Sequence, residues 1–158
     1  MVLTENAIYL LYFMIVRVRK LHPDAVIPTY SKPGDAGMDL TAVEVERDAT
    51  GNYCYNTGLS LEIPDGHVGL LFPRSSNTKK ALTLGNSVGV IDSGYRGPII
   101  LKYRPLTFAH AHRPEEAYVV GDRVGQIIII PYRNIHFLEV TELSASERGE
   151  GGFGSTGK

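Results

Sequence analysis

The sequence of 158 residues lacks several features that would place it in particular classes of protein. It has one cysteine, Cys54, which excludes an intramolecular disulfide and a cysteine-rich metal site and fits a reducing cytosol. Its formal net charge of −1 argues against general binding to nucleic acid, which needs a basic surface. A small phosphorylated ligand needs only a few local cations, and it stays compatible with this composition.

The chain also lacks a long apolar run. The longest, AIYLLYFMIV at residues 7–16, has ten residues, which is too short to span a bilayer. Only Glu5 is charged before it, whereas a signal peptide begins with positive charge. We therefore expect a cytoplasmic protein without a membrane partner. We interpret residues 1–13 as an apolar extension before the domain, with Met14 as an alternative start.

No long stretch has the 3.6-residue period of an amphipathic helix, and at most one short helix is expected, at residues 78–84. Leu59, Leu61 and Ile63 alternate with polar residues, as in a half-buried strand. Further short β-type runs are HVGLLF, VGVI, PIILKY, AYVV and IHFLEV, separated by many of the 17 glycines and nine prolines. The isoleucine run at residues 127–130 predicts a central strand buried on both faces. The pattern predicts one all-β domain, a sandwich or barrel.

The chain ends in RGEGGFGSTGK, residues 148–158, with five glycines. The last seven residues fit the phosphate-binding loop G-x-x-x-x-G-K, but the Ser/Thr that should follow and the helix that should continue are both missing. Two interpretations stay open. One is a tail without structure. The other is a mobile arm that folds over a phosphate group, with Phe153 as a stacking ring and hydroxyls from Ser155 and Thr156.

Other polar residues lie where the apolar runs end. PRSSNTKK follows HVGLLF and offers a phosphate the Arg74 guanidinium and the hydroxyls of Ser75 and Ser76, although serine is also common in turns. Asp92 directly follows VGVI within a hairpin signal. From this stretch alone, Asp92 is equally well a general base facing a water molecule or a residue that caps the turn.

Two further segments place polar groups among apolar ones, where they are costly unless paired or functional. GDRVGQIIII contains Arg123 and Gln126, and PGDAGMDL contains Asp39, which backbone N–H groups could satisfy. His110 and His112, in a polar loop at residues 104–117, are better explained as solvated than as metal ligands.

A candidate base, a glycine-rich arm and the three cations Arg74, Arg123 and Arg148 indicate a nucleotide or another polyphosphate ligand. They do not identify the reaction.

Five segments, in order and spacing, resemble the five motifs of the trimeric dUTPase family: PGDAGMDL, PRSSNTKK, GNSVGVIDSGYRGPI, GDRVGQIII and RGEGGFGSTG. The resemblance runs from about residue 16 to the end of the chain. It implies a jelly-roll-like β-barrel and hydrolysis of dUTP to dUMP and pyrophosphate, with Mg²⁺ bound by the triphosphate. It also implies a homotrimer with sites shared between subunits. The implied biological role is to keep uracil out of DNA and to supply dUMP for thymidylate synthesis.

The resemblance also implies roles for matching residues. Asp92 would activate the water that attacks the α-phosphorus, Tyr95 would pack under the deoxyribose and exclude a 2′-hydroxyl, and Asp39 would contact magnesium through water or support the site. Asn86 and the main chain of residues 86–100 would bind uracil, on which Phe153 would stack. The full set of nucleotide-binding positions is Arg74, Ser75, Ser76, Asn86, Val90, Tyr95, Ile100, Gln126, Arg148, Phe153, Gly154, Ser155 and Thr156.

On this basis we expect an extension at residues 1–13, a β-barrel domain at residues 14–147 and an arm at residues 148–158 that closes over a nucleotide site. The chain departs from the family in the long loop at residues 104–117, in the extension, and in Ser76, where many members have glycine. Two alternatives stay open: a non-catalytic nucleotide sensor on the same fold, which would not need Asp92, and a dCTP deaminase, against which the complete arm argues.

Overall fold

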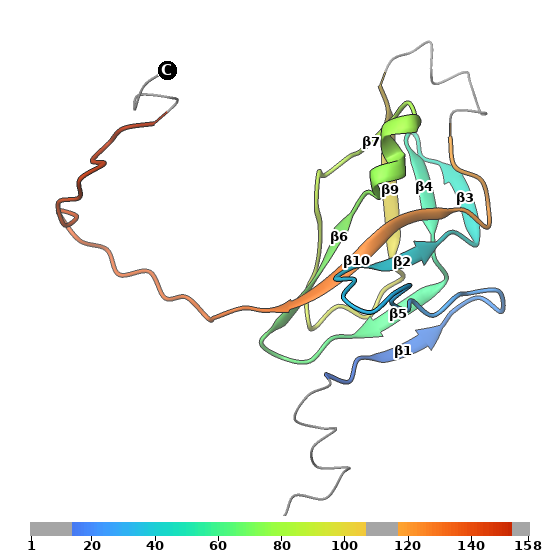
Figure 1. Ribbon diagram of the computed structural model, residues 1–158, viewed down its shortest axis with the longest axis horizontal. Helices are drawn as coiled ribbons and strands as arrows, with labels where there is room; N and C mark the ends of the chain where they lie inside the picture. The colour runs from blue at the N-terminus through green and yellow to red at the C-terminus, as the bar shows by residue number, and fades with distance from the viewer. Residues whose placement is uncertain (1–13, 107–116, 153–158) are drawn as a thin grey trace, which may run out of the picture.

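The computed structural model describes residues 14–106 and 117–152, in which ten short strands and one 3₁₀ helix lie (Figure 1). All strand pairs are antiparallel. One four-stranded sheet has the order β2-β10-β6-β8, a second has the order β3-β4-β9-β7, and β1 pairs with β5. The elements are β1 Arg17–Lys20, β2 Met38–Thr41, β3 Glu44–Arg47, β4 Tyr53–Asn56, β5 Leu59–Glu62, β6 His67–Phe72, η1 Ser75–Lys79, β7 Leu82–Leu84, β8 Gly89–Ile91, β9 Ile100–Pro105 and β10 Arg123–Pro131. The predicted all-β, jelly-roll-like class is confirmed.

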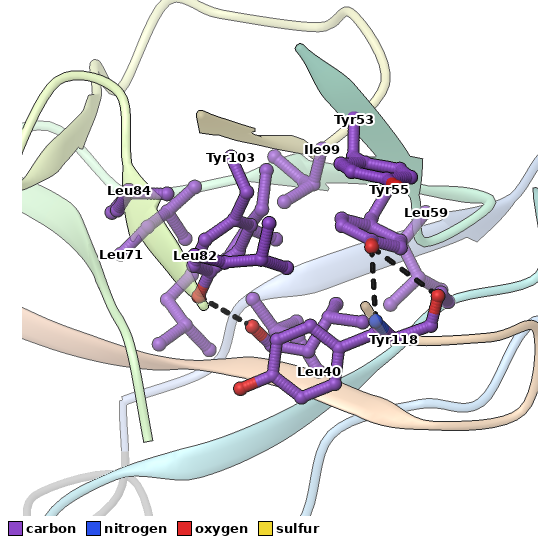
Figure 2. Close-up of a cluster of buried hydrophobic side chains, with 14 of the residues drawn as sticks. Leu40, Tyr53, Tyr55, Leu59, Leu71, Leu82, Leu84, Ile99, Tyr103 and Tyr118 are labelled. Atoms are coloured by element: carbon purple, nitrogen blue, oxygen red, sulfur yellow. Dashed lines mark hydrogen bonds between the residues drawn. The ribbon is translucent and has the colours of Figure 1, made fainter. Parts of the chain in front are cut away.

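A cluster of tyrosines lies in the core between the sheets (Figure 2). The ring of Tyr55 meets those of Tyr103 and Tyr118 edge to face, with centroids 5.8 and 5.7 Å apart. A buried tyrosine hydroxyl needs a partner. That of Tyr103 donates to the main-chain oxygen of Val124 at 2.7 Å, and that of Tyr55 bonds the main chain of Tyr118. Burial raises the pKa of Tyr55 and of Tyr103, so both hydroxyls stay protonated donors at neutral pH.

The isoleucine run lies in the second half of β10, which is inside its sheet, between β2 and β6, as predicted. The prediction that it is buried on both faces is wrong. Ile127 is 1% exposed, whereas Ile130 is 39% exposed. Ile127 and Ile129 pack toward the core, so the alternation of a strand turns Ile128 and Ile130 to the other face.

We call this second face the outer face of the sheet. The register places Ile128 opposite Leu70, and Leu70 opposite Val90, which is 60% exposed. Residues that lie directly opposite one another share a face. The outer face therefore carries apolar side chains over three adjacent strands, exposed at Val90 and Ile130 and half-buried at Leu70 and Ile128.

Three other local predictions need correction. AYVV, residues 117–120, forms a turn rather than a strand, and the segment predicted as a helix contains only the end of η1 before β7 begins. IHFLEV, residues 135–140, is not a strand in the single chain, because beyond Pro131 the chain leaves the domain and pairs with no sheet edge (Figure 1). None of the helices in the described ranges is long and apolar enough to cross a membrane.

Gly125 allows the two sheets to approach closely. A Cβ atom at this position would lie 2.3 Å from Leu101 Cδ2 and 2.9 Å from the main-chain oxygen of Phe72. The register of β10 on β2 also shifts between Arg123 and Gly125. A side chain at this position would push β10 away from both β9 and β6.

We therefore expect Gly125→Ala to lower the free energy of unfolding by about 2 kcal/mol, which is typical of an overpacked core. Urea denaturation followed by circular dichroism measures this change. Gly94→Ala is the matched control, because a Cβ at Gly94 meets no atom within 4 Å. Equal urea midpoints for the two variants would contradict this account of Gly125.

Candidate active site

The first group of predicted site residues forms an ion-pair cluster, which we call the arginine–aspartate cluster: Asp39, Arg74 and Arg123. Arg74 Nε donates to Asp39 Oδ1 at 2.6 Å, and Arg123 Nη1 donates to Asp39 Oδ2 at 2.9 Å. The Asp39 side chain is only 22% exposed. Two guanidinium groups, not the backbone N–H groups suggested by the sequence, satisfy this carboxylate. The cluster keeps one net positive charge, as an anion site requires.

The segment after β6 adds polar groups to this cluster. Arg74 Nη1 donates to Ser76 Oγ at 3.3 Å, and Gln126 Nε2 donates to the main-chain oxygen of Pro73 at 3.0 Å. Ser75 begins η1 and is exposed. No side chain caps this end of η1, and within the described residues the N–H groups of Ser75 and Ser76 have no acceptor. The structure thus brings together the phosphate-binding residues predicted from PRSSNTKK and GDRVGQIII.

The second group lies on residues 85–99, the connection between β7 and β9 that contains β8. The predicted hairpin is wrong, because β8 pairs with β6 in the first sheet, whereas β9 pairs with β4 and β7 in the second. We call residues 85–99 the β7–β9 connection. Asn86 is exposed at its turn, where Ser87 has φ of 62° and the N–H of Val88 bonds Asn86 O. A cavity of about 340 Å³ opens between this turn and β9. Its lining comes from both strands and the neighbouring core: Asn52, Leu71, Leu84, Gly85, Asn86, Gly89, Ile100, Leu101, Lys102 and Arg104. Asn86 and Ile100 were predicted site residues. Lys102 and Arg104 were not, because they appear in the sequence only as the outward residues of a strand.

Asp92 stands in the turn that follows β8. Its main-chain oxygen accepts from the N–H of Tyr95 at 3.0 Å, which closes the turn. Its side chain is exposed, and the carboxylate accepts no hydrogen bond from the described residues. The turn therefore depends on the Asp92 backbone and not on the carboxylate, which weakens the interpretation of Asp92 as a cap.

The ring of Tyr95 lies across Gly97. A Cβ at Gly97 would come within 2.3 Å of the Tyr95 hydroxyl oxygen, so this position must be glycine while the ring is there. The hydroxyl donates to the main-chain oxygen of Pro98 at 3.1 Å, and the side chain is 42% exposed. The β7–β9 connection therefore presents an aromatic ring in the same turn as Asp92.

The two groups lie far apart within one chain. Ile91 pairs with Gly69, so Asp92 stands beside Val68, near the start of β6. Arg74 lies just past the end of β6 with an extended backbone. From Val68 to Arg74 is six residues, or about 20 Å at about 3.4 Å per residue. Asp92 and the arginine–aspartate cluster cannot act on one small ligand in a single chain.

The C-terminal segment contacts neither group in the single chain. After Pro131 it runs away from both sheets, and residues 133–150 are exposed (Figure 1). Arg148 is exposed, and its Nε donates to the main-chain oxygen of Gly151 at 2.8 Å in a local turn. Phe153, Gly154, Ser155 and Thr156 lie outside the described residues.

Two residues that the sequence did not single out also contact this region. The Tyr118 hydroxyl donates to Asn77 Oδ1 at 3.0 Å, and Asn77 belongs to η1. Burial raises the pKa of Tyr118, and the nearby Arg74 guanidinium acts in the opposite direction. No sequence signal distinguishes this pair, because AYVV resembles an ordinary apolar run.

The described residues contain no group of three or more His, Cys, Asp or Glu side chains that could hold a metal ion. Asp39 is the carboxylate that contacts the predicted phosphate-binding residue Arg74, and both of its oxygens accept hydrogen bonds from arginine. A cation at this site would therefore keep most of its ligands from water or from the bound anion.

Three comparisons with known proteins all point to one family. A sequence model of the dUTPase family matches residues 23–157. The deoxyuridine 5'-triphosphate nucleotidohydrolase of Thermobifida fusca is 41% identical over 147 residues, which cover 90% of this chain and 78% of that protein. The protein of the same name from Solibacter usitatus is 40% identical over 151 residues, which cover 92% of this chain and 97% of the relative. Among solved structures, the Staphylococcus bacteriophage 80alpha dUTPase with dUpNHpp has a TM-score of 0.76 and 26% identity, covering 91% of this chain and 99% of the other.

Proposed function

The chain belongs to the dUTPase family, and from this premise we propose that it hydrolyses dUTP to dUMP and pyrophosphate. The observation that carries the proposal is the Asp92 carboxylate, which is exposed beside the Tyr95 ring without a protein hydrogen-bond partner in the described ranges. The reaction keeps uracil out of DNA and supplies dUMP for thymidylate synthesis.

The chemistry assigns a part of the substrate to each group. Uracil binds at the β7–β9 connection, where Asn86 and the main chain near Val90 and Ile100 offer hydrogen bonds, and the deoxyribose packs on Tyr95. Asp92 takes a proton from a water molecule while the water oxygen bonds the α-phosphorus. The bond from that phosphorus to the bridging oxygen breaks, and pyrophosphate leaves. General-base action of this kind suits a carboxylate without other partners.

The phosphates bind at the other group. Arg74, Ser75, Ser76 and Gln126 hold them, with charge supplied by the arginine–aspartate cluster. Mg²⁺ bound by the triphosphate would supply positive charge that offsets part of the phosphate charge. Asp39 would contact this metal through water at most, because its own oxygens are engaged by Arg74 and Arg123.

We propose a homotrimer, because one chain separates the two groups by about 20 Å along β6. A second copy seated on the outer face of the sheet would cover Ile128, Ile130 and Val90 and would bring its own cluster toward Asp92. The segment after Pro131 supports the same assembly. Phe137 is 97% exposed and Leu138 is 84% exposed, a cost that contact with a neighbour removes.

The arm at residues 148–158 closes over the site of another subunit. Arg148, Gly154, Ser155 and Thr156 hold the outer phosphates, and Phe153 stacks on uracil. We propose the division into an extension at residues 1–13, a domain at residues 14–147 and this arm. We place the protein in the cytoplasm, without a nucleic-acid or membrane partner.

Asp92→Asn should keep the fold and nucleotide binding and should lower kcat by about 100- to 10,000-fold, the range typical of a general base. Pyrophosphate release from dUTP measures the rate, and binding of dUpNHpp measures the site. Near-normal turnover with intact binding would show that the carboxylate is not the base. It would favour the nucleotide sensor if the unmodified protein were also inactive.

The position of Tyr95 predicts selectivity for the sugar. The protein should convert dUTP and leave UTP, dCTP and dTTP nearly untouched. In Gly97→Ala, the added methyl group should displace the Tyr95 ring and lower the preference for dUTP over UTP about tenfold. Gly94→Ala, in the same connection, should leave the selectivity unchanged. Equal selectivity of the Gly97 and Gly94 variants would refute the role of Tyr95. Release of ammonia from dCTP would indicate the deaminase instead.

Mixed assemblies test whether the site is shared. Asp92→Asn and Arg74→Gln homotrimers should both be nearly inactive. After the two variants are unfolded and refolded together in equal amounts, about a quarter of the sites should pair an intact Asp92 with an intact Arg74 from another chain. Turnover should then reach about a quarter of the unmodified rate. Native mass spectrometry confirms that the subunits have mixed. Mixed trimers without activity would place both residues in a site of one chain.

A further inference from the structure

The loop that carries the phosphate-binding residues, residues 73–77, is weakly anchored by its own sequence. The helix η1 has five residues, none of them buried, and no side chain caps its first turn. A helix this short is not stable in isolation. Its position must therefore come from contacts that reach it from the rest of the domain.

One such contact begins at Tyr118, which is 5% exposed at the edge of the tyrosine cluster (Figure 2). Its ring meets Tyr55 and Tyr103 edge to face, and its main chain both donates to and accepts from the Tyr55 hydroxyl. Its own hydroxyl then donates to Asn77 Oδ1 at 3.0 Å. Tyr118 thus connects the rigid core directly to η1.

Asn77 uses the whole of its side chain in this connection. While its Oδ1 accepts from Tyr118, its Nδ2 donates to the main-chain oxygen of Leu82 at 2.9 Å, at the start of β7. Lys80, just after η1, donates to the main-chain oxygen of Ala117 at 2.8 Å and lies 5.1 Å from the centre of the Tyr118 ring. The end of η1 is therefore tied to the residues around Tyr118.

The same stretch of chain holds the other end of the loop. Gln126 donates to the main-chain oxygen of Pro73, and Arg123 shares the Asp39 carboxylate with Arg74. Residues 118–126 thus contact the loop in three places. Gln126 bonds Pro73 at its beginning, Arg123 shares the Asp39 carboxylate with Arg74, and Tyr118 bonds Asn77 at its end.

We propose that Tyr118 and Asn77 are positioning residues, which fix residues 73–77 so that Arg74, Ser75 and Ser76 meet the phosphates of the substrate. The proposal rests on the function given above. Neither residue needs to touch the nucleotide: the Tyr118–Asn77 hydrogen bond acts through the orientation of η1. The loss of this bond should weaken binding of the phosphates and should leave the binding of uracil and deoxyribose unchanged.

Tyr103 provides a matched control. It belongs to the same cluster, is 0% exposed, and its hydroxyl donates to a main-chain oxygen, that of Val124, at 2.7 Å. That bond ends inside β10 and not on the loop. Tyr103→Phe and Tyr118→Phe each remove one buried hydroxyl and keep the ring, so they should lower the melting temperature by similar amounts. Only Tyr118→Phe should affect phosphate binding.

The experiment measures kcat and KM for dUTP and the dissociation constant of inorganic pyrophosphate for both variants, with deoxyuridine as the ligand that lacks all the phosphates. Tyr118→Phe should weaken pyrophosphate binding and raise KM about fivefold, the effect of one hydrogen bond, with deoxyuridine affinity unchanged. Asn77→Ala also removes the bond to Leu82 and should cause a loss at least as large. The double variant should be no worse than Asn77→Ala alone, because both changes remove the Tyr118–Asn77 bond.

Equal pyrophosphate affinity for the Tyr118 and Tyr103 variants would overturn the proposal, and so would additive losses in the Tyr118/Asn77 double variant. The pyrophosphate measurement needs no turnover. If the unmodified protein failed to hydrolyse dUTP, the proposed function would fall, while the comparison of the two tyrosine variants would still decide how the loop is held.

Discussion

The register of β10 between β2 and β6 is the constraint on which both parts of the site depend. It places Gln126 opposite Asp39 on one side and Phe72 on the other, so the cluster and the loop after β6 begin at one row of the sheet. Gly125 allows this row to form, since any side chain there would meet the backbone of β6. A shift of one residue would turn Gln126 to the core and Ile127 to the outer face. The ligand groups and the core packing are therefore fixed by the same pairing.

The sequence was informative where local chemistry decides the structure. Alternation at Leu59, Leu61 and Ile63 correctly predicted β5, and the order of the five motifs led to the family that the comparisons show. Prediction from the sequence failed where strand pairing or contacts between distant residues determine the structure. IHFLEV has the composition of a strand, but a strand needs a neighbouring edge, and the single chain offers it none. The Tyr118–Asn77 bond joins residues 41 positions apart, so no local pattern could indicate it.

The outer face of the sheet carries apolar residues that a single chain leaves at least partly exposed. The row of Ile128, Leu70 and Val90 lies between the end of the sheet that carries Asp92 and the end that carries the arginine–aspartate cluster. In the proposed homotrimer, contact between chains along this row would contribute hydrophobic free energy. It would also set the separation between the proposed base of one chain and the proposed phosphate-binding groups of another. Assembly and catalysis would then share one surface, so a change in this apolar row would alter the geometry of the site as well as the stability of the oligomer.

Repulsion within the arginine–aspartate cluster acts on the loop at residues 73–77. Two guanidinium groups repel one another, and a single carboxylate at 2.6 and 2.9 Å offsets this repulsion only in part while no anion is bound. A short helix with no buried residue has little packing energy of its own to resist such a force. The contacts from residues 118–126 oppose it from the core side, where the tyrosine cluster is rigid. In this arrangement, packing in the core holds residues 73–77 in place before a polyphosphate binds. The ligand therefore does not have to order this loop when it binds.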